Sequence, residues 1–210
     1  YYKKFFVPEE YRGGHVMLQF EGIYRNASVF VNQSKVGGSA YGYTDFTVEA
    51  GDYLKYGEDN EVLVAVKCGT RSSRWYSGAG IYKDVWMIRG GSVYVRPQDL
   101  RFTALEVDGE GALVCVAAKI RNDSLSAQTL QVSVTIEDAE GNKAVDNTYP
   151  VRMNSRAAVD LRKNVYIDQA KLWDEFSPEL YTITVAVSDG EKILDTATAT
   201  SGIRKLSVDT

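Results

Sequence analysis

The stretch Leu130-Gln-Val-Ser-Val-Thr-Ile-Glu137 decides the fold class, because apolar and polar side chains alternate along it without interruption. A period of two places successive side chains on opposite faces of an extended strand. The same alternation recurs at residues 16–23, 27–32, 61–67, 114–120 and 181–188. No window of useful length carries a sustained helical period, and short helical turns are expected only near residues 50–54 and 170–173. The sequence therefore predicts an all-β chain.

A boundary between two domains is indicated by Gly90-Gly-Ser-Val-Tyr-Val-Arg-Pro97, where paired glycines end one element and a proline interrupts the ladder. Composition changes there too, because ten of the 14 tyrosines lie in residues 1–91. About seven alternating runs over roughly 105 residues follow Pro97, which fits an immunoglobulin-like sandwich without the Cys…Trp…Cys spacing of antibody domains. Trp173 is a candidate for its core. We expect domains at residues 1–91 and 92–206.

Charge and composition exclude several classes of function. The net charge of −4 and the scattered lysines and arginines argue against a partner that is nucleic acid or an anionic membrane surface. No apolar run approaches the roughly 20 residues that a membrane helix needs. The single histidine, His15, has no histidine partner for a metal site or a proton relay. Cys68 and Cys115 lie in apolar runs and are expected to be two buried free thiols.

The chain begins Tyr1-Tyr-Lys-Lys-Phe-Phe-Val-Pro8, which is typical of sequence inside a strand. We expect the first domain to be truncated at its N-terminus and to leave an unpaired sheet edge that could meet another copy. No targeting segment is recognisable. The compartment therefore stays open, and a bacterial periplasmic or secreted location and a cytoplasmic one are both compatible with the sequence.

The richest cluster of recognition side chains is Ser73-Arg-Trp-Tyr-Ser-Gly-Ala-Gly-Ile-Tyr-Lys-Asp-Val-Trp86. Tryptophan, tyrosine and arginine present flat faces with hydrogen-bonding tips. Three residues precede the Gly-rich turn and are placed to protrude as a ligand or interface surface: Arg74, Trp75 and Tyr76. Three others alternate into an apolar run, where they either cap the core or lie at the surface: Ile81, Val85 and Trp86.

No catalytic residue is predicted within the chain. Its carboxylate pairs, Glu9-Glu10, Asp138/Glu140 and Asp174-Glu175, lie among turn residues, where solvation accounts for them. Glycosidic chemistry needs two carboxyl groups facing one another across a rigid cleft. No phosphate loop, dinucleotide fingerprint, nucleophile elbow or zinc-protease motif occurs either, so no cofactor and no metal are expected.

Several blocks in order resemble one known family. They are Tyr2-Lys-Lys-Phe-Phe-Val-Pro-Glu-Glu-Tyr11, Leu18-Gln-Phe-Glu-Gly-Ile-Tyr-Arg-Asn-Ala-Ser-Val-Phe-Val-Asn-Gln-Ser-Lys-Val-Gly37, Gly42-Tyr-Thr-Asp-Phe46, Asn60-Glu-Val-Leu-Val-Ala-Val66, Arg74–Trp86, Leu172-Trp-Asp-Glu-Phe-Ser-Pro-Glu-Leu-Tyr-Thr-Ile-Thr-Val185 and Gly202-Ile-Arg-Lys205. Together they span nearly the whole chain. The chain resembles the non-catalytic front end of glycoside hydrolase family 2, the group of β-galactosidases, β-glucuronidases and β-mannosidases.

The resemblance implies a fold of two β-sandwiches. Residues 1–91 would form a partial jelly-roll (galactose-binding-like) sugar-binding domain, residues 92–206 an immunoglobulin-like sandwich, and residues 207–210 the start of a linker. A (β/α)8 barrel with two catalytic glutamates would follow outside the chain, so the parent would be a retaining glycosidase and this chain alone inactive. Arg74, Trp75 and Tyr76 would be the lip of the substrate pocket. The implied partners are a terminal β-glycoside and the chain's own barrel, and a homo-oligomer stays open.

One departure bears on the substrate. Some β-galactosidases place an acidic residue before the aromatic pair, where this chain has Ser72-Ser73. A β-galactoside is therefore the first expectation, and a β-glucuronide or β-mannoside remains open. Two other readings remain: a stand-alone carbohydrate-binding module that uses the aromatic segment for stacking, and an adhesion or scaffold protein whose sandwiches only mediate contacts.

Overall fold

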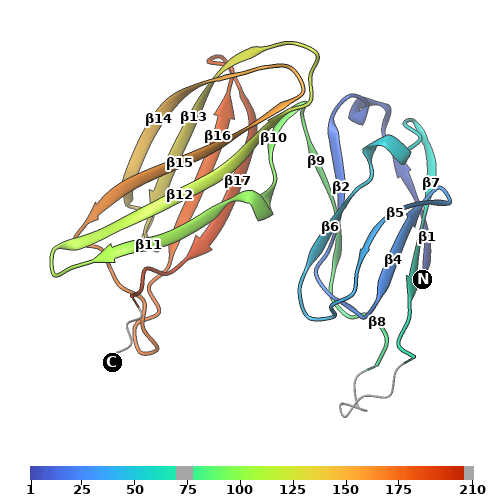
Figure 1. Cartoon of the computed structure of the whole chain (residues 1–210), viewed down its shortest axis with the longest axis horizontal. Coiled ribbons are helices and arrows are strands. Elements are labelled where there is room, and N and C mark those ends of the chain that lie inside the picture. The colour runs from blue at the N-terminus through green and yellow to red at the C-terminus, as the bar shows by residue number, and fades with distance from the viewer. Residues whose placement is uncertain (70–77, 206–210) are drawn as a thin grey trace. The chain divides into compact units, whose positions relative to one another are not determined.

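The structure, a computed structural model, describes residues 1–69 and 78–205. Within these residues the regular structure consists of strands and three single-turn 3-10 helices. The chain forms two compact units, Tyr1–Gly90 and Gly91–Thr210, and each is described by itself (Figure 1). Each unit packs sheet against sheet around its own apolar core. The prediction of an all-β chain built from two β-sandwiches is confirmed.

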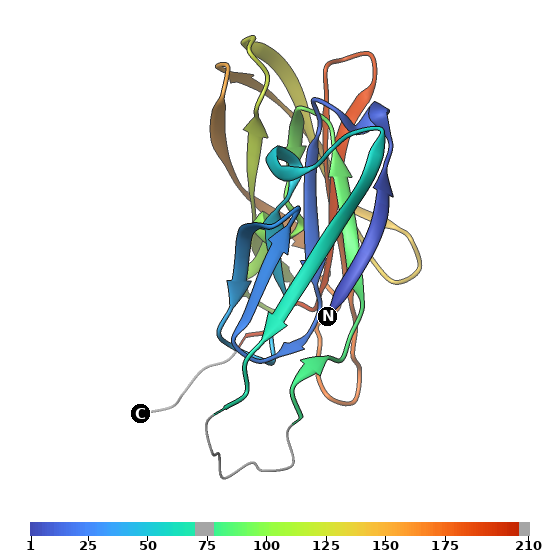
Figure 2. The same ribbon diagram turned by 90° about the vertical axis from the view of Figure 1, so that its right-hand side faces the viewer.

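The first unit contains two larger antiparallel sheets and a short two-stranded one. One sheet has the order β1-β7-β4-β5, made of Tyr2–Val7, Glu58–Val66, Ala27–Val31 and Ser34–Ser39. The other has the order β6-β2-β9, made of Phe46–Glu49, His15–Phe20 and Val85–Gly90. Strands β3 (Ile23–Tyr24) and β8 (Gly80–Ile81) pair with each other. Figure 2 shows the β1-β7-β4-β5 sheet turned toward the viewer.

Alternation explains why these segments form a sandwich. In β4, Ala27, Val29 and Val31 are buried, while Ser28 and Phe30 between them are half-buried on the other face. The inward set joins residues of β2 such as Val16, Leu18 and Phe20 in one apolar cluster. Burying one face of each strand in this way is the main stabilising term of a sandwich.

The second unit repeats the plan with longer strands. One sheet joins β10 (Val93–Val95), β11 (Arg101–Val107) and β15 (Ala157–Asp168) to β12 (Gly111–Asn122). The other has the order β14-β13-β16-β17, made of Lys143–Met153, Gln128–Glu137, Tyr181–Ser188 and Ile193–Ser201. The stretch that predicts the fold class is β13, whose inward residues Leu130, Val132, Val134 and Ile136 are all fully buried.

The expected helical turns have different outcomes. The turn near residues 50–54 is confirmed as a 3-10 helix at Gly51–Tyr53, and two more occur at Glu9–Tyr11 and Pro97–Asp99. The turn expected near residues 170–173 is wrong. The Lys171 amide donates to the Tyr181 hydroxyl and the Trp173 amide donates to the Ile203 carbonyl, both at 2.8 Å. These bonds run to residues outside the segment and take the place of the local bonds that a helical turn would make.

The two cysteines also differ. Cys115 is buried in β12, as expected, whereas the prediction that Cys68 is buried is wrong, because Cys68 lies beyond the last residue of β7 and is exposed. Among the described residues, no group of three or more His, Cys, Asp or Glu side chains could hold a metal ion. No helix in this part of the chain has the length and apolar character needed to cross a bilayer.

Candidate functional site

The candidate site is the end of the first unit where β7 leaves the sheet and β8 returns. The predicted site residues Arg74, Trp75 and Tyr76 belong to residues 70–77, outside the described residues. The chain on both sides of this segment is held by hydrogen bonds and strand pairing. The Asn26 side-chain amide donates to the Lys67 carbonyl at 3.2 Å, and β8 pairs with β3 through Ile81 and Gly80.

Four tyrosines gather at this end, and we call Tyr24, Tyr41, Tyr43 and Tyr82 the tyrosine cluster. The rings of Tyr24 and Tyr43 meet edge to face with centroids 5.3 Å apart, and those of Tyr41 and Tyr43 do so at 5.7 Å. The Tyr82 hydroxyl donates to the Gly42 carbonyl at 2.7 Å. Tyr24 is buried, but the other three are at least half exposed. The cluster therefore presents aromatic faces to solvent from an ordered base.

Two glycines allow the rings to lie this close to the backbone. A Cβ atom at Gly22 would lie 2.6 Å from the Tyr82 ring, and one at Gly42 would lie 2.4 Å from the Tyr24 ring. Both contacts are shorter than van der Waals distance. Glycine at these two positions is therefore what lets the tyrosines pack on neighbouring segments.

A cation lies beside the cluster. The Arg25 guanidinium carbon is 5.6 Å from the centroid of the Tyr24 ring, within cation–π range. Its Nε atom is buried and has no hydrogen-bond partner among the described residues. Arg25 thus has donor capacity that this part of the chain does not use.

Of the three residues for which the sequence leaves core and surface open, one is partly buried and two are exposed. Ile81 is partly buried and packs on the first core. Trp86 is 52% exposed, and its indole Nε1 donates to the Glu21 carboxylate at 2.9 Å. Val85 is also exposed. The end of the unit therefore carries a further indole at its surface.

The chemistry of this end is recognition. Exposed tyrosine faces stack on apolar ring surfaces, and their hydroxyl groups donate and accept hydrogen bonds. The Glu21 carboxylate accepts from Trp86 and the Asp45 carboxylate accepts from the Gln19 side chain at 3.2 Å, so both serve as acceptors within the fold. The sequence alone does not identify the tyrosine cluster or Arg25 as candidate site residues. The signals were the tyrosine-rich first half and the block Gly42–Phe46, but neither shows that segments 22–25, 41–43 and 80–82 meet.

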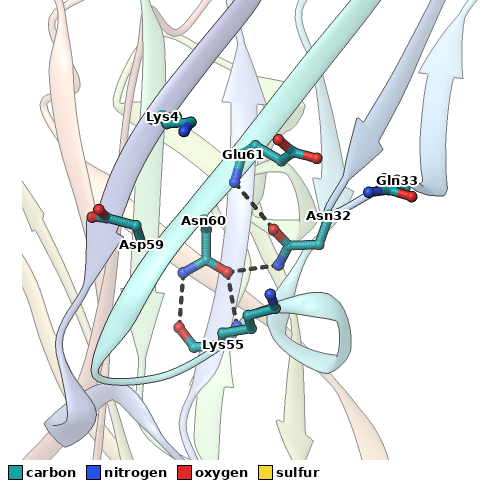
Figure 3. A pocket seen from close by; sticks show the side chains of 7 residues that line it. All are labelled: Lys4, Asn32, Gln33, Lys55, Asp59, Asn60 and Glu61. Carbon is teal, nitrogen blue, oxygen red and sulfur yellow. Dashed lines mark hydrogen bonds between the residues drawn. The ribbon is translucent and has the colours of Figure 1, made fainter.

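Apart from the tyrosine cluster, the first unit has a hollow of about 320 Å³, called here the second hollow (Figure 3). It lies where β7 begins, at the opposite end of this strand from Val66. Its floor is a network around Asn60, which is buried. The Asn60 side chain accepts from the Lys55 backbone N–H and the Asn32 side-chain amide, both at 2.7 Å. It donates to the backbone carbonyls of Lys55 and Glu58. The amide thus joins the turn between β4 and β5 to the start of β7.

Comparison with known proteins agrees with this architecture. Residues 93–204 match the family model described as glycosyl hydrolases family 2. All of the chain aligns with a β-galactosidase of Bacteroides ovatus at 31% identity, covering 25% of that enzyme. All of it also aligns with a β-glucuronidase of Bacteroides fragilis at 26% identity, covering 32%. A crystal structure of a glycosyl hydrolase family 2 member from Bacteroides cellulosilyticus superposes over 98% of the chain with a TM-score of 0.91, at 24% identity and over 28% of its own length.

The chain thus spans about a quarter to a third of the length of these relatives. The structural likeness concerns the fold, which is that of two β-sandwiches. The family model covers more than half of the chain, 112 of its 210 residues as counted from 93 to 204. The chain therefore belongs to glycosyl hydrolase family 2.

Proposed function

We propose that this chain is the non-catalytic front portion of a retaining β-glycosidase, with a terminal β-galactoside as substrate. Residues 1–91 act as a jelly-roll sugar-binding domain and residues 92–206 as an immunoglobulin-like domain. Residues 207–210 begin the linker to a catalytic barrel. These four residues lie outside the described part of the chain. Within the longer protein, Arg74, Trp75 and Tyr76 form a lip of the substrate pocket.

The tyrosine cluster carries this proposal. Its exposed tyrosines come from chain segments before and after the one that contains Arg74, Trp75 and Tyr76. A pyranose ring stacks on aromatic faces of this kind. A lip without the remaining walls buries too little of a ligand for tight binding. The chain alone is therefore expected to be inactive and to bind monosaccharides weakly at this end.

The test compares the 210-residue chain with the longer protein that carries it. The longer protein should release p-nitrophenol from p-nitrophenyl β-galactoside, and the purified chain should release none. Trp75→Ala in the longer protein should lower kcat/KM by about tenfold or more, whereas Tyr166→Ala, at an exposed tyrosine of the second unit, should not. Turnover by the chain alone, or an unchanged kcat/KM in the Trp75 variant, would refute the proposal.

A β-glucuronide is the second candidate substrate, and Arg25 favours it. A guanidinium with an unused buried donor suits the carboxylate of a glucuronic acid ring. Relatives with both activities in their names align over the whole chain. In the longer protein, Arg25→Gln should lower kcat/KM for the glucuronide more than for the galactoside if this candidate holds. Equal effects on both substrates would leave the galactoside as the substrate.

A further inference from the structure

The outer face of the β1-β7-β4-β5 sheet carries an ordered row of apolar side chains. Tyr2 of β1 lies opposite Leu63 of β7, and Leu63 lies opposite Phe30 of β4. Partners in register point to the same face of a sheet. Tyr2, at the start of the edge strand β1, is 57% exposed, and Leu63, in the inner strand β7, is 44% exposed. The row is therefore an apolar platform that the chain leaves open to solvent.

The Tyr2 ring is held across this platform at both ends. Its Cβ is fixed on β1, and its hydroxyl donates to Glu61 Oε2 on β7 at 3.0 Å. The hydroxyl is tethered while more than half of the residue stays exposed, so the ring is held in place with much of its surface open to solvent. The hydrogen bond to Glu61 also raises the pKa of Tyr2, so the hydroxyl stays a donor at neutral pH. A ring ordered in advance loses little rotamer entropy when a ligand stacks on it.

The second hollow begins beside this ring. Lys4 and Glu61, which lie opposite each other on β1 and β7, form one wall, and Asp59, Gln33 and Lys55 form the rest (Figure 3). Two ammonium groups and two carboxylates line it, so the formal charges cancel. Its volume of about 320 Å³ is at the small end of the range for ligand sites. The hollow therefore suits a small, neutral, polar group.

The floor is rigid while the rim is free to bind. The Asn32 side-chain amide donates to the Tyr53 carbonyl at 2.8 Å and to Asn60, and its oxygen accepts from the Glu61 amide at 3.1 Å. By contrast, the side chains of Lys4, Gln33, Lys55 and Asp59 make no hydrogen bond within the described residues. An aromatic face next to free acceptors and donors over a fixed base matches a sugar ring, which has an apolar face and a rim of hydroxyl groups.

We propose that this outer face is a second, non-catalytic glycan-binding site. A neutral pyranose stacks on Tyr2 and donates a hydroxyl group to Glu61, and the next sugar unit of the glycan donates to Asp59 and accepts from Gln33 in the hollow. Strand β7 begins at the hollow with Glu58 and ends at Val66, so Asp59 and Glu61 lie roughly 17–23 Å along the strand from the end where β7 leaves the sheet. Its role is to hold a polysaccharide chain on the protein rather than to present the bond that is cleaved.

The experiment is an amide NMR titration of the 15N-labelled chain with lactose and with cellobiose, up to tens of millimolar. Saturable shifts should centre on residues 2, 4, 33, 59 and 61. Tyr2→Ala should weaken binding by about fivefold or more. Tyr166→Ala is the matched control, because Tyr166 is also an exposed strand tyrosine whose hydroxyl donates to a carboxylate, that of Asp108 at 3.3 Å. This control should bind like the unchanged chain.

Gln33→Gly separates binding from folding. Gln33 has a φ of 70°, a conformation that glycine adopts without strain, so removing this side chain should not destabilise the turn. Weaker sugar binding by a variant that is at least as stable as the unchanged chain supports the site. Shifts confined to the tyrosine cluster, no saturable shifts at all, or equal binding of sodium glucuronate would each overturn the proposal. None of these results bears on the activity of the longer protein, which is measured separately.

Discussion

Two asparagines show how single residues hold this fold. Among the described residues, Asn60 and Asn122 are the buried polar side chains, and each makes four hydrogen bonds. Asn122 donates to the carbonyls of Ser126 and Asn154 and accepts from the backbone and hydroxyl of Ser124. A buried amide with every group satisfied ties irregular backbone to a strand without a desolvation penalty.

Asn60→Ala should therefore lower the free energy of unfolding of the first unit by about 2–3 kcal/mol, because it leaves the part-buried backbone N–H and carbonyl of Lys55 without their side-chain partner. Urea denaturation followed by tryptophan fluorescence and circular dichroism measures the loss. Asn147→Ala, at an exposed position of β14, is the control and should change stability by less than about 0.5 kcal/mol. If both variants lose the same small amount, the network is not a structural tie.

Trp173 corrects the expectation that it belongs to the second core. It is half-buried and lies outside the core cluster, against Gly202, where a Cβ atom would come within 2.5 Å of the Trp173 Cβ. The Arg204 guanidinium carbon is 5.1 Å from its ring. The indole thus covers the last described segment of the chain from outside the core.

Trp173→Ala should accordingly cost about 1–2 kcal/mol, below the roughly 3–5 kcal/mol of a core tryptophan. Ile183→Ala, at a fully buried position of β16, serves as the comparison and should cost about 2–4 kcal/mol. Thermal unfolding of both variants decides the order. A larger loss of stability in the Trp173 variant than in the Ile183 variant would show that Trp173 contributes to the stability like a core residue.

At the level of elements, the hairpin turns β11–β12, β13–β14 and β16–β17 of the second unit use the same device. Asp108, Asp138 and Asp189 each accept hydrogen bonds from two backbone N–H groups a few residues ahead. Backbone donors lower the pKa of Asp108 and Asp189, and the Asn142 side chain is the largest cause of the lowered pKa of Asp138. These turns are therefore stabilised by ionised carboxylates.

The pH dependence follows from the sign of these shifts. Each carboxylate has a lower pKa in the folded chain than the value near 3.9 in an unfolded one, so it stabilises the fold fully above about pH 5. That contribution is lost as pH falls below about 4. Asp189→Asn should flatten the decline in urea midpoint between about pH 5 and pH 2, whereas Asp160→Asn, at a mostly exposed residue that faces Lys119, should not. Identical pH profiles for the Asp189 variant and the unchanged chain would contradict this.

Sequence predicts strands far better than it predicts the candidate site. The sequence predicts β13 and β16 correctly, because burial of one face requires apolar and polar residues to alternate along each strand. The two-residue strands β3 and β8 carry no such pattern, and their pairing depends on segments that are far apart in the chain. The tyrosine cluster depends on the same long-range approach. The apolar run that contains Cys68 wrongly predicts burial, because such a run does not mark where the strand leaves the sheet.

At the scale of the whole molecule, the two cores have no residue in common within the described part of the chain. The residues of the first cluster end at Val64, with partly buried neighbours up to Ile81, and those of the second begin at Val93. Each sandwich therefore buries its apolar faces within its own segment of chain. An independent core is the physical basis of an independent folding unit.

Residues 91–205 expressed alone should consequently fold. The fragment should show the dispersed amide spectrum of a β-sandwich and a cooperative urea transition. Ile183→Ala should destabilise the fragment and the whole chain equally, to within about 0.5 kcal/mol. A fragment that stays unfolded at neutral pH would show that the second core depends on the first unit.

The exposure of Cys68 gives the molecule a natural attachment point. Because Cys115 is buried inside β12, a maleimide dye added to the native chain should form a single adduct, which mass spectrometry would count. That dye would sit two residues after the end of β7, far along the strand from the hollow at its start. Quenching or brightening on addition of a glycan would then report which end of the sheet the glycan occupies, without any engineered cysteine.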